Sequence, residues 1–159
     1  MEKDFNGVLF RINGYSCAID ALEIREILGG TEWKPPSVEG EPGAFLQVRG
    51  KVAKVWDLRQ TLGFEPAARE GVNSFIAVQA PGDDRNRLVA LWVDLVLELM
   101  AIPGRELKAL PGSFTEMPAR YFRAFFDQDG VPVYVLNLPE ILKAGFPDEK
   151  ELALEDKAS

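Results

Sequence analysis

The side chains that could carry catalysis are few in this chain and lack their usual activators. The sequence contains no histidine, so the commonest general base and the commonest transition-metal ligand are both missing. Ser16 and Cys17 are adjacent nucleophiles, but the single cysteine has no partner for a disulfide or a zinc site. We expect Cys17 to be a small buried hydrophobe. No glycine-rich phosphate-binding motif occurs.

The 25 acidic residues are the remaining candidates for chemistry. A paired-carboxylate site of the kind found in glycosidases stays open on sequence alone. However, Asp20 and Asp57 stand where helix caps are expected, and most other acids fall in turns or near the C-terminus. The run 127–130 resembles part of a calcium loop but lacks the distal glutamate of that motif. We therefore expect no enzyme activity, no metal and no cofactor.

The elements that must position any site are short strands separated by turns. The expected hairpins join 8–12 to 15–19, 45–48 to 52–56, 74–80 to 87–93, and 121–126 to 133–138. Asn13-Gly14 is a strong signal for the first, because a type I′ turn needs positive φ at both central residues. Short helices are expected over 21–28, over 58–62 and from 137 towards 144. Many short strands joined by turns predict a barrel or a sandwich.

Two segments of the chain are similar to each other. Gly50–Leu58 aligns with Gly130–Leu138, each reading as turn glycine, strand, Asp or Asn cap, and a following leucine. Ala18–Asp20 aligns in the same way with Trp92–Asp94. Chance matches in a β-rich chain are the alternative. The interpretation we favour is two similar small barrels, each marginal alone and therefore packed on the other.

Composition limits the partners and the compartment. A net charge of −7 argues against a broad nucleic-acid surface, and the apolar runs are too short for membrane insertion. The charged N-terminus is unlike a signal peptide, and a lone cysteine suits a reducing compartment. We expect a cytoplasmic protein whose residues 147–159 form an acidic, solvated C-terminal tail.

Four blocks of this sequence resemble the CheW-like domain family. Phe10–Leu28 resembles the opening of such domains, with an aromatic strand, a hairpin and an Ile-Asp turn. Val48–Arg59 resembles the family's Leu-Arg-Gly…Val-Asp-Leu-Arg signature. Val89–Asp94 and Val133–Leu142 match two further blocks, in the family's order and spacing.

The resemblance implies a fold that agrees with the internal repeat. We expect an all-β chain with a few short helices, built as two small five-stranded SH3- or OB-like barrels packed on one another with exchanged strands. A single CheW-like domain would span 5–146. Its barrel subdomains would cover about 14–68 and 69–142, with the N-terminal strand a candidate for exchange.

The resemblance also implies a function. Members of the family are non-enzymatic scaffolds that couple chemoreceptor tips to the histidine kinase CheA. A hydrophobic groove between their barrels takes the receptor's helical hairpin, and its contributors carried over by position are Ile24, Glu26, Ile27, Arg49 and Phe75. The expected partners are the regulatory domain of a CheA-type kinase, a methyl-accepting chemoreceptor tip and other CheW-like domains, with recruitment to receptor arrays.

Two departures from the family's pattern keep an alternative open. The segment Ala44–Gln47 has lost the usual glycine and asparagine, and Arg120–Phe126 is bulky where the family is usually small and glycine-rich. Such changes could alter a partner surface without altering the fold. The alternative is a CheW-fold protein that binds a kinase regulatory domain or another partner without receptors and regulates a specialised output such as motility.

Overall fold

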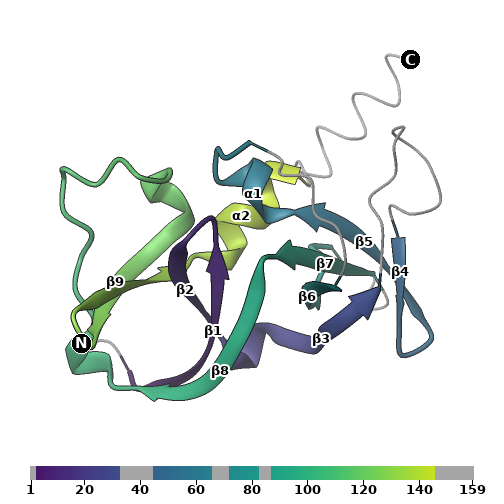
Figure 1. Ribbon diagram of the computed structural model, residues 1–159, viewed down its shortest axis with the longest axis horizontal. Helices are drawn as coiled ribbons and strands as arrows, with labels where there is room; N and C mark the ends of the chain where they lie inside the picture. The colour runs from purple at the N-terminus through teal and green to yellow at the C-terminus, as the bar shows by residue number, and fades with distance from the viewer. Residues whose placement is uncertain (1–2, 33–44, 66–71, 83–86, 146–159) are drawn as a thin grey trace.

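Ten strands form two five-stranded sheets in the computed structural model, which describes residues 3–32, 45–65, 72–82 and 87–145 (Figure 1). The strands are β1 (Phe5–Ile12), β2 (Tyr15–Asp20), β3 (Ile24–Glu32), β4 (Phe45–Val48), β5 (Lys51–Asp57), β6 (Val72–Gln79), β7 (Leu88–Val93), β8 (Leu95–Ile102), β9 (Phe122–Gln128) and β10 (Val131–Leu136). The first sheet has the order β8-β1-β2-β10-β9, and the second has the order β3-β6-β7-β5-β4. Two short helices, α1 (Leu58–Thr61) and α2 (Leu138–Gly145), follow β5 and β10.

The turn chemistry of the sequence places the hairpins correctly. Asn13 and Gly14 have φ of 49° and 83°, and Asp129 and Gly130 have φ of 52° and 83°. Arg49 lies at the tip between β4 and β5 with φ of 50°, followed by a glycine that also has positive φ. Positive φ at both central residues is what a type I′ hairpin turn requires. The four expected hairpins are confirmed as the pairs β1–β2, β4–β5, β6–β7 and β9–β10.

The internal repeat of the sequence has a structural counterpart. Strand β10 pairs in parallel with β2, and β5 pairs in parallel with β7, so the two sheets repeat one arrangement. The caps expected for the two helices are also present. Asp57 accepts a hydrogen bond from the amide of Arg59 at 3.0 Å, and Asn137 accepts one from the amide of Glu140 at 3.4 Å.

The chain leaves the first sheet after β2 and returns to it at β8, so the second sheet is the continuous run β3 to β7 and the first joins β1 and β2 to β8, β9 and β10. Strand β3 follows β2 in sequence but pairs with β6 of the second sheet, with Ile27 opposite Ile76. Strand β8 follows β7 but pairs with β1 of the first sheet, with Val8 opposite Leu99. The expected exchange of strands between the barrels is therefore confirmed, with the crossings at β3 and β8. The strands do not divide at about residue 68 as expected: β6 and β7 belong with β3–β5, and β2 accompanies the N-terminal strand into the sheet of β8–β10.

The helix expected over 21–28 is wrong. Only Ala21–Glu23 forms a 3-10 turn, which Asp20 caps by accepting the amide of Leu22 at 3.0 Å. From Ile24 onward the chain is strand β3, and its register against β6 shifts between Ile24 and Glu26. This irregularity breaks the alternation typical of a strand, so the apolar spacing resembled a helical face.

The two sheets share one hydrophobic core. Phe10 and Ile19 of the first sheet belong to the same buried cluster as Ile76 and Leu91 of the second. Leu62 after α1 and Ile141 of α2 complete this cluster. Alternate residues of each sheet belong to separate clusters, with Phe75 in the second sheet and Leu9 in the first, so the barrels pack on one another through the opposite sheet faces, which carry the shared cluster.

Cys17 should be chemically inert in the folded protein. It lies in β2 with no exposed surface, and burial raises the pKa of its thiol, so the reactive thiolate is suppressed. We expect an aromatic disulfide reagent to label it only in denaturant, which absorbance of the released thiolate would measure. Stoichiometric labelling of the native protein within minutes would contradict this burial.

Candidate partner-binding surface

Glu26 and Arg49 join the two edges of the second sheet. Glu26 belongs to edge strand β3, and Arg49 stands at the tip that leads from the opposite edge strand, β4, into β5. The Arg49 Nε forms an ion pair with the Glu26 carboxylate, which is 22% exposed, whereas the arginine side chain is 81% exposed. The pair forms where the two edges of the curled sheet meet, and it leaves most of Arg49 at the surface.

The other three predicted site residues differ in exposure. Ile24 is partly buried against the shared core, and Ile27 is 37% exposed. Phe75 has no exposed surface and stacks on Trp92 with ring centroids 6.4 Å apart. Of the five residues, Ile24 and Glu26 are partly exposed, Ile27 and Arg49 are exposed, and only Phe75 is fully buried. Phe75 instead supports β3 from beneath, where its register partner is Leu28.

Exposed leucines on β8 escaped the sequence reasoning. Leu95, Leu97 and Leu99 are 49%, 43% and 63% exposed. They do not share one face of the strand, because β8 shifts register against β1 between Val8 and Phe10, so that Val96 packs on the shared cluster but Met100 packs on the first sheet's own cluster. Large apolar side chains clustered on the surface usually mark a site of interaction. The alternation of leucines from 95 to 99 indicates a strand in the sequence. No glycine or proline follows Val93 to mark a turn, so this strand was not predicted.

The exposed leucines and Ile27 lie on the two exchanged strands. Strands β3 and β8 are edge strands of their sheets, and both run along the lower side of the molecule in Figure 1. We call these four residues (Ile27, Leu95, Leu97 and Leu99) the crossover surface. It is aliphatic and sits on strands whose positions are fixed by pairing with β1 and β6.

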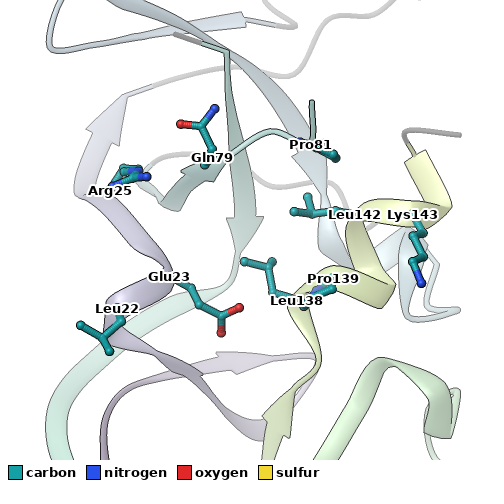
Figure 2. A pocket seen from close by; sticks show the side chains of 9 residues that line it. All are labelled: Leu22, Glu23, Arg25, Gln79, Pro81, Leu138, Pro139, Leu142 and Lys143. Atoms are coloured by element: carbon teal, nitrogen blue, oxygen red, sulfur yellow. The ribbon is translucent and has the colours of Figure 1, made fainter. Parts of the chain in front are cut away.

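A pocket of about 430 Å³ lies between the 3-10 turn, the end of β6 and α2 (Figure 2). Its lining residues are Leu22, Glu23, Arg25, Gln79, Pro81, Leu138, Pro139, Leu142 and Lys143. Burial raises the pKa of Glu23, and the charge of Asp20 adds to this while Arg123 opposes it. The pocket is mainly apolar with charges of both signs, a lining suited to docking rather than to proton transfer.

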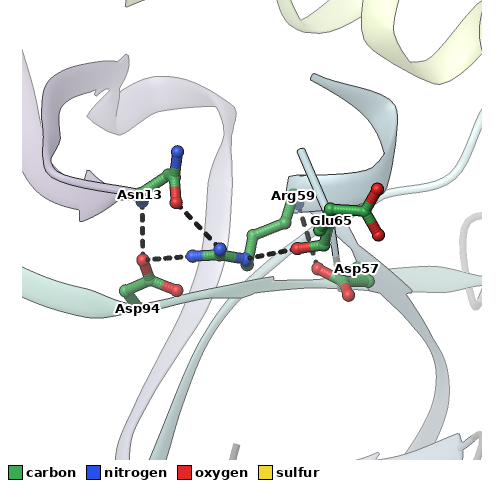
Figure 3. A network of polar contacts seen from close by, with 5 residues as sticks. All are labelled: Asn13, Asp57, Arg59, Glu65 and Asp94. Carbon is green, nitrogen blue, oxygen red and sulfur yellow. Dashed lines mark hydrogen bonds and ion pairs between the residues drawn. The ribbon is translucent and has the colours of Figure 1, made fainter. Parts of the chain in front are cut away.

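A polar network around Arg59 connects the two sheets (Figure 3). From α1, which follows β5 of the second sheet, the Arg59 guanidinium donates to Asp94 Oδ2 at 3.1 Å and to Asn13 Oδ1 at 2.8 Å. Asn13, at the β1–β2 turn of the first sheet, donates its amide to the same Asp94 oxygen at 2.6 Å. Arg59 Nε also donates to the carbonyl of Glu65 at 3.3 Å. We call Asn13, Arg59 and Asp94 the clasp.

The described part of the chain contains neither a cluster of metal-binding side chains nor a membrane-spanning helix. Over residues 3–32, 45–65, 72–82 and 87–145, no three His, Cys, Asp or Glu side chains converge to hold a metal ion. Within the same ranges, no helix has the length and apolar character needed to cross a bilayer. The surfaces that remain are aliphatic, aromatic or mixed in charge, which suits binding.

Comparison with known proteins agrees with this architecture. The profile of the CheW-like domain family matches residues 6–146. The chain is 22% identical over 147 residues to the chemotaxis protein CheW of Rhizobium meliloti (strain 1021), covering 92% of this chain and 90% of the relative. It superimposes on the crystal structure of the scaffolding protein TtCheW from Thermoanaerobacter tengcongensis with a TM-score of 0.65 at 20% identity, covering 86% and 90% of the two chains. The architecture is thus the CheW fold of two SH3-like barrels, and the chain belongs to the CheW-like domain family.

Proposed function

We propose that this protein is a non-enzymatic, cytoplasmic adaptor that couples the tip of a chemoreceptor to a CheA-type histidine kinase. The observation that carries the proposal is the crossover surface, whose exposed aliphatic side chains stand on the paired edge strands β3 and β8. Family membership supports it, as do relatives named as a chemotaxis protein and a scaffolding protein.

Exposed leucines on an edge strand suit a helical partner, because an amphipathic helix presents an apolar face. Leu95, Leu97 and Leu99 do not form a single row, since β8 shifts register against β1 between Val8 and Phe10. In the proposal, Leu99 is the main anchor on β8, because it is the most exposed of the three. A receptor tip built as a helical hairpin would present such a face.

Arg49 and Glu26 give the same region a polar border. Arg49 is largely exposed although it pairs with Glu26, so its guanidinium keeps donors for a partner's carboxylate or carbonyl. Aliphatic anchors with a polar rim are the usual composition of a protein interface. In the proposal, Ile24, Glu26, Ile27 and Arg49 contribute to partner binding, and buried Phe75 holds β3 in position.

The direct test is titration calorimetry with two separate partners. A receptor-tip fragment and the regulatory domain of the cognate kinase are each titrated into the full chain. The adaptor proposal expects saturable binding to both and a ternary complex when all three are mixed. Binding to neither partner would defeat the proposal.

Arg49→Ala is expected to weaken one of these complexes about five- to tenfold, as loss of an interface arginine often does. Circular dichroism should stay unchanged, because an exposed ion pair contributes at most about 1 kcal/mol to stability. Lys51→Ala, an exposed cation two residues away, is the matched control and should bind as the wild type. Equal affinities for both variants and the wild type would remove Arg49 from the binding site.

A second candidate function is an adaptor that binds the kinase or another partner without receptors. Phe45 is 51% exposed in one of the segments that depart from the family's pattern, which favours an altered surface there. The other departing segment offers less support, because Tyr121, Phe122 and Phe126 are buried and change the core. Kinase binding with no detectable receptor binding would select this second function.

A further inference from the structure

The connection between β8 and β9 encloses a small cavity on the first sheet. This segment, residues 103–121, is long and irregular, a type of loop that often carries function. It is anchored by two backbone hydrogen bonds between Lys108 and Phe125, at 2.8 Å and 2.9 Å. The cavity has a volume of about 110 Å³, opens to solvent and is lined by Pro111, Ser113, Phe114, Glu116, Phe125 and Tyr134.

Three aromatic rings form the walls of this cavity. The ring centroids of Phe114 and Tyr134 lie 5.0 Å apart with the planes inclined at 48°. Those of Phe125 and Tyr134 lie 6.3 Å apart at 43°. All three rings line the cavity, and neither of these pairs is stacked in parallel. Each ring face carries the negative part of an aromatic quadrupole.

The charges around the cavity are mainly negative. Glu116 is the only ionisable carboxylate in the lining, and it is exposed, with one oxygen accepting the amide of Thr115 at 3.0 Å. Burial raises the pKa of Tyr134, and the charges of Glu116 and Asp127 are among the causes that raise it further. Lys108 lies over Phe125 at 5.9 Å but is neutralised by Asp127 at 3.0 Å and is not part of the lining.

We propose that this aromatic cage (Phe114, Glu116, Phe125 and Tyr134) binds an alkylated ammonium group. Rings around a small space with a carboxylate beside it favour a cation that is large, weakly hydrated and covered with methyl groups. The cavity is smaller than the roughly 150 Å³ that admits benzene, so it takes a head group and leaves the rest of the ligand outside. This inference does not depend on the proposed adaptor function.

The test is a titration of the full chain with tetramethylammonium chloride and with choline, followed by NMR of the aromatic ring protons at constant ionic strength. We expect saturable shifts at Phe114, Phe125 and Tyr134. The neutral isostere of choline, 3,3-dimethylbutan-1-ol, should bind about tenfold more weakly because it lacks the charge. No saturable shift, or equal affinity for the neutral isostere, would overturn the proposal.

Variants separate the cage from general apolar binding. Glu116→Gln should weaken binding about three- to tenfold, and Phe114→Leu, which keeps apolar volume, should weaken it about tenfold. Glu106→Gln, an exposed glutamate on the same connection, is the matched control and should leave affinity unchanged. Unchanged affinity in both cage variants, with wild-type circular dichroism, would overturn the assignment.

A further titration distinguishes a methylated side chain of a protein from a small free cation as the ligand. A peptide containing trimethyllysine is compared with free choline under the same conditions. Tighter binding of the peptide assigns the cage to a modified side chain of a partner protein. Tighter binding of choline assigns it to a small free cation, and failure of both to bind defeats the proposal.

Discussion

Arg59→Met is expected to destabilise the folded chain by about 1–2 kcal/mol, because it removes charge-assisted hydrogen bonds from a mostly buried side chain, whereas the partners Asn13 and Asp94 are exposed and can be solvated. The Arg59 side chain is only 12% exposed, and its guanidinium donates hydrogen bonds to Asp94, Asn13 and the Glu65 carbonyl. Methionine keeps the length and the apolar contacts but supplies no donor. Urea denaturation followed by circular dichroism would measure the loss as a lower midpoint at unchanged slope.

A double-mutant cycle with Asp94→Asn tests whether the clasp acts as a unit. The two groups lie 3.1 Å apart, so the double variant should lose at least about 1 kcal/mol less than the sum of the single variants. Arg105→Met, an exposed arginine in the 3-10 turn Gly104–Glu106, is the matched control and should change stability by less than about 0.5 kcal/mol. A similarly small loss for Arg59→Met would show that the clasp does not hold the sheets together.

Leu99→Glu is expected to reduce affinity for the receptor-tip fragment by about 30- to 100-fold, because it removes an anchor and leaves a charge facing an apolar helix. Leu99 is the most exposed of the three leucines at 63%, so the fold should be little affected. Calorimetry with the receptor fragment measures the affinity. Binding of the kinase regulatory domain is measured in parallel to show that the variant is folded and still binds its other partner.

The matched control for the leucine is Val131→Glu. Val131 is a half-exposed aliphatic residue in β10 of the same sheet, outside the crossover surface. It should bind the receptor fragment as the wild type does. Undiminished receptor binding by folded Leu99→Glu would exclude β8 from the interface, and equal losses in both variants would indicate a non-specific charge effect.

Local turn chemistry made much of the fold predictable. The turns at Asn13-Gly14 and Asp129-Gly130 need positive φ at both residues, which only a few residue types adopt readily. These short motifs therefore predict the two hairpins. Strand β8 could not be read in this way, because a single residue, Asp94, separates it from β7. Its pairing with β1 depends on contacts between distant parts of the chain.

The candidate site was less predictable than the fold. Glu26 and Arg49 were expected at the same groove, but their ion pair exists because the second sheet curls until its opposite edges meet. The sequence also did not indicate which apolar residues are exposed. Ile27 and Phe75 are both apolar residues of strands, but Ile27 is exposed, whereas Phe75 is buried and stacks on Trp92. The aromatic cage also escaped notice, since its rings come from a loop and from two paired strands.

The exchange of β3 and β8 has a consequence for synthesis on the ribosome. The second sheet has all its strands once Val93 has been made, whereas the first sheet must wait for Leu136. The β1–β2 hairpin is translated first, yet the strands that flank it on both sides, β8 and β10, are among the last. One face of the hairpin, with Leu9 and Ala18, packs on Ile102, Phe126 and Val135, so it stays without its partners until late in translation, when aggregation is a hazard. The barrel that begins first is completed last.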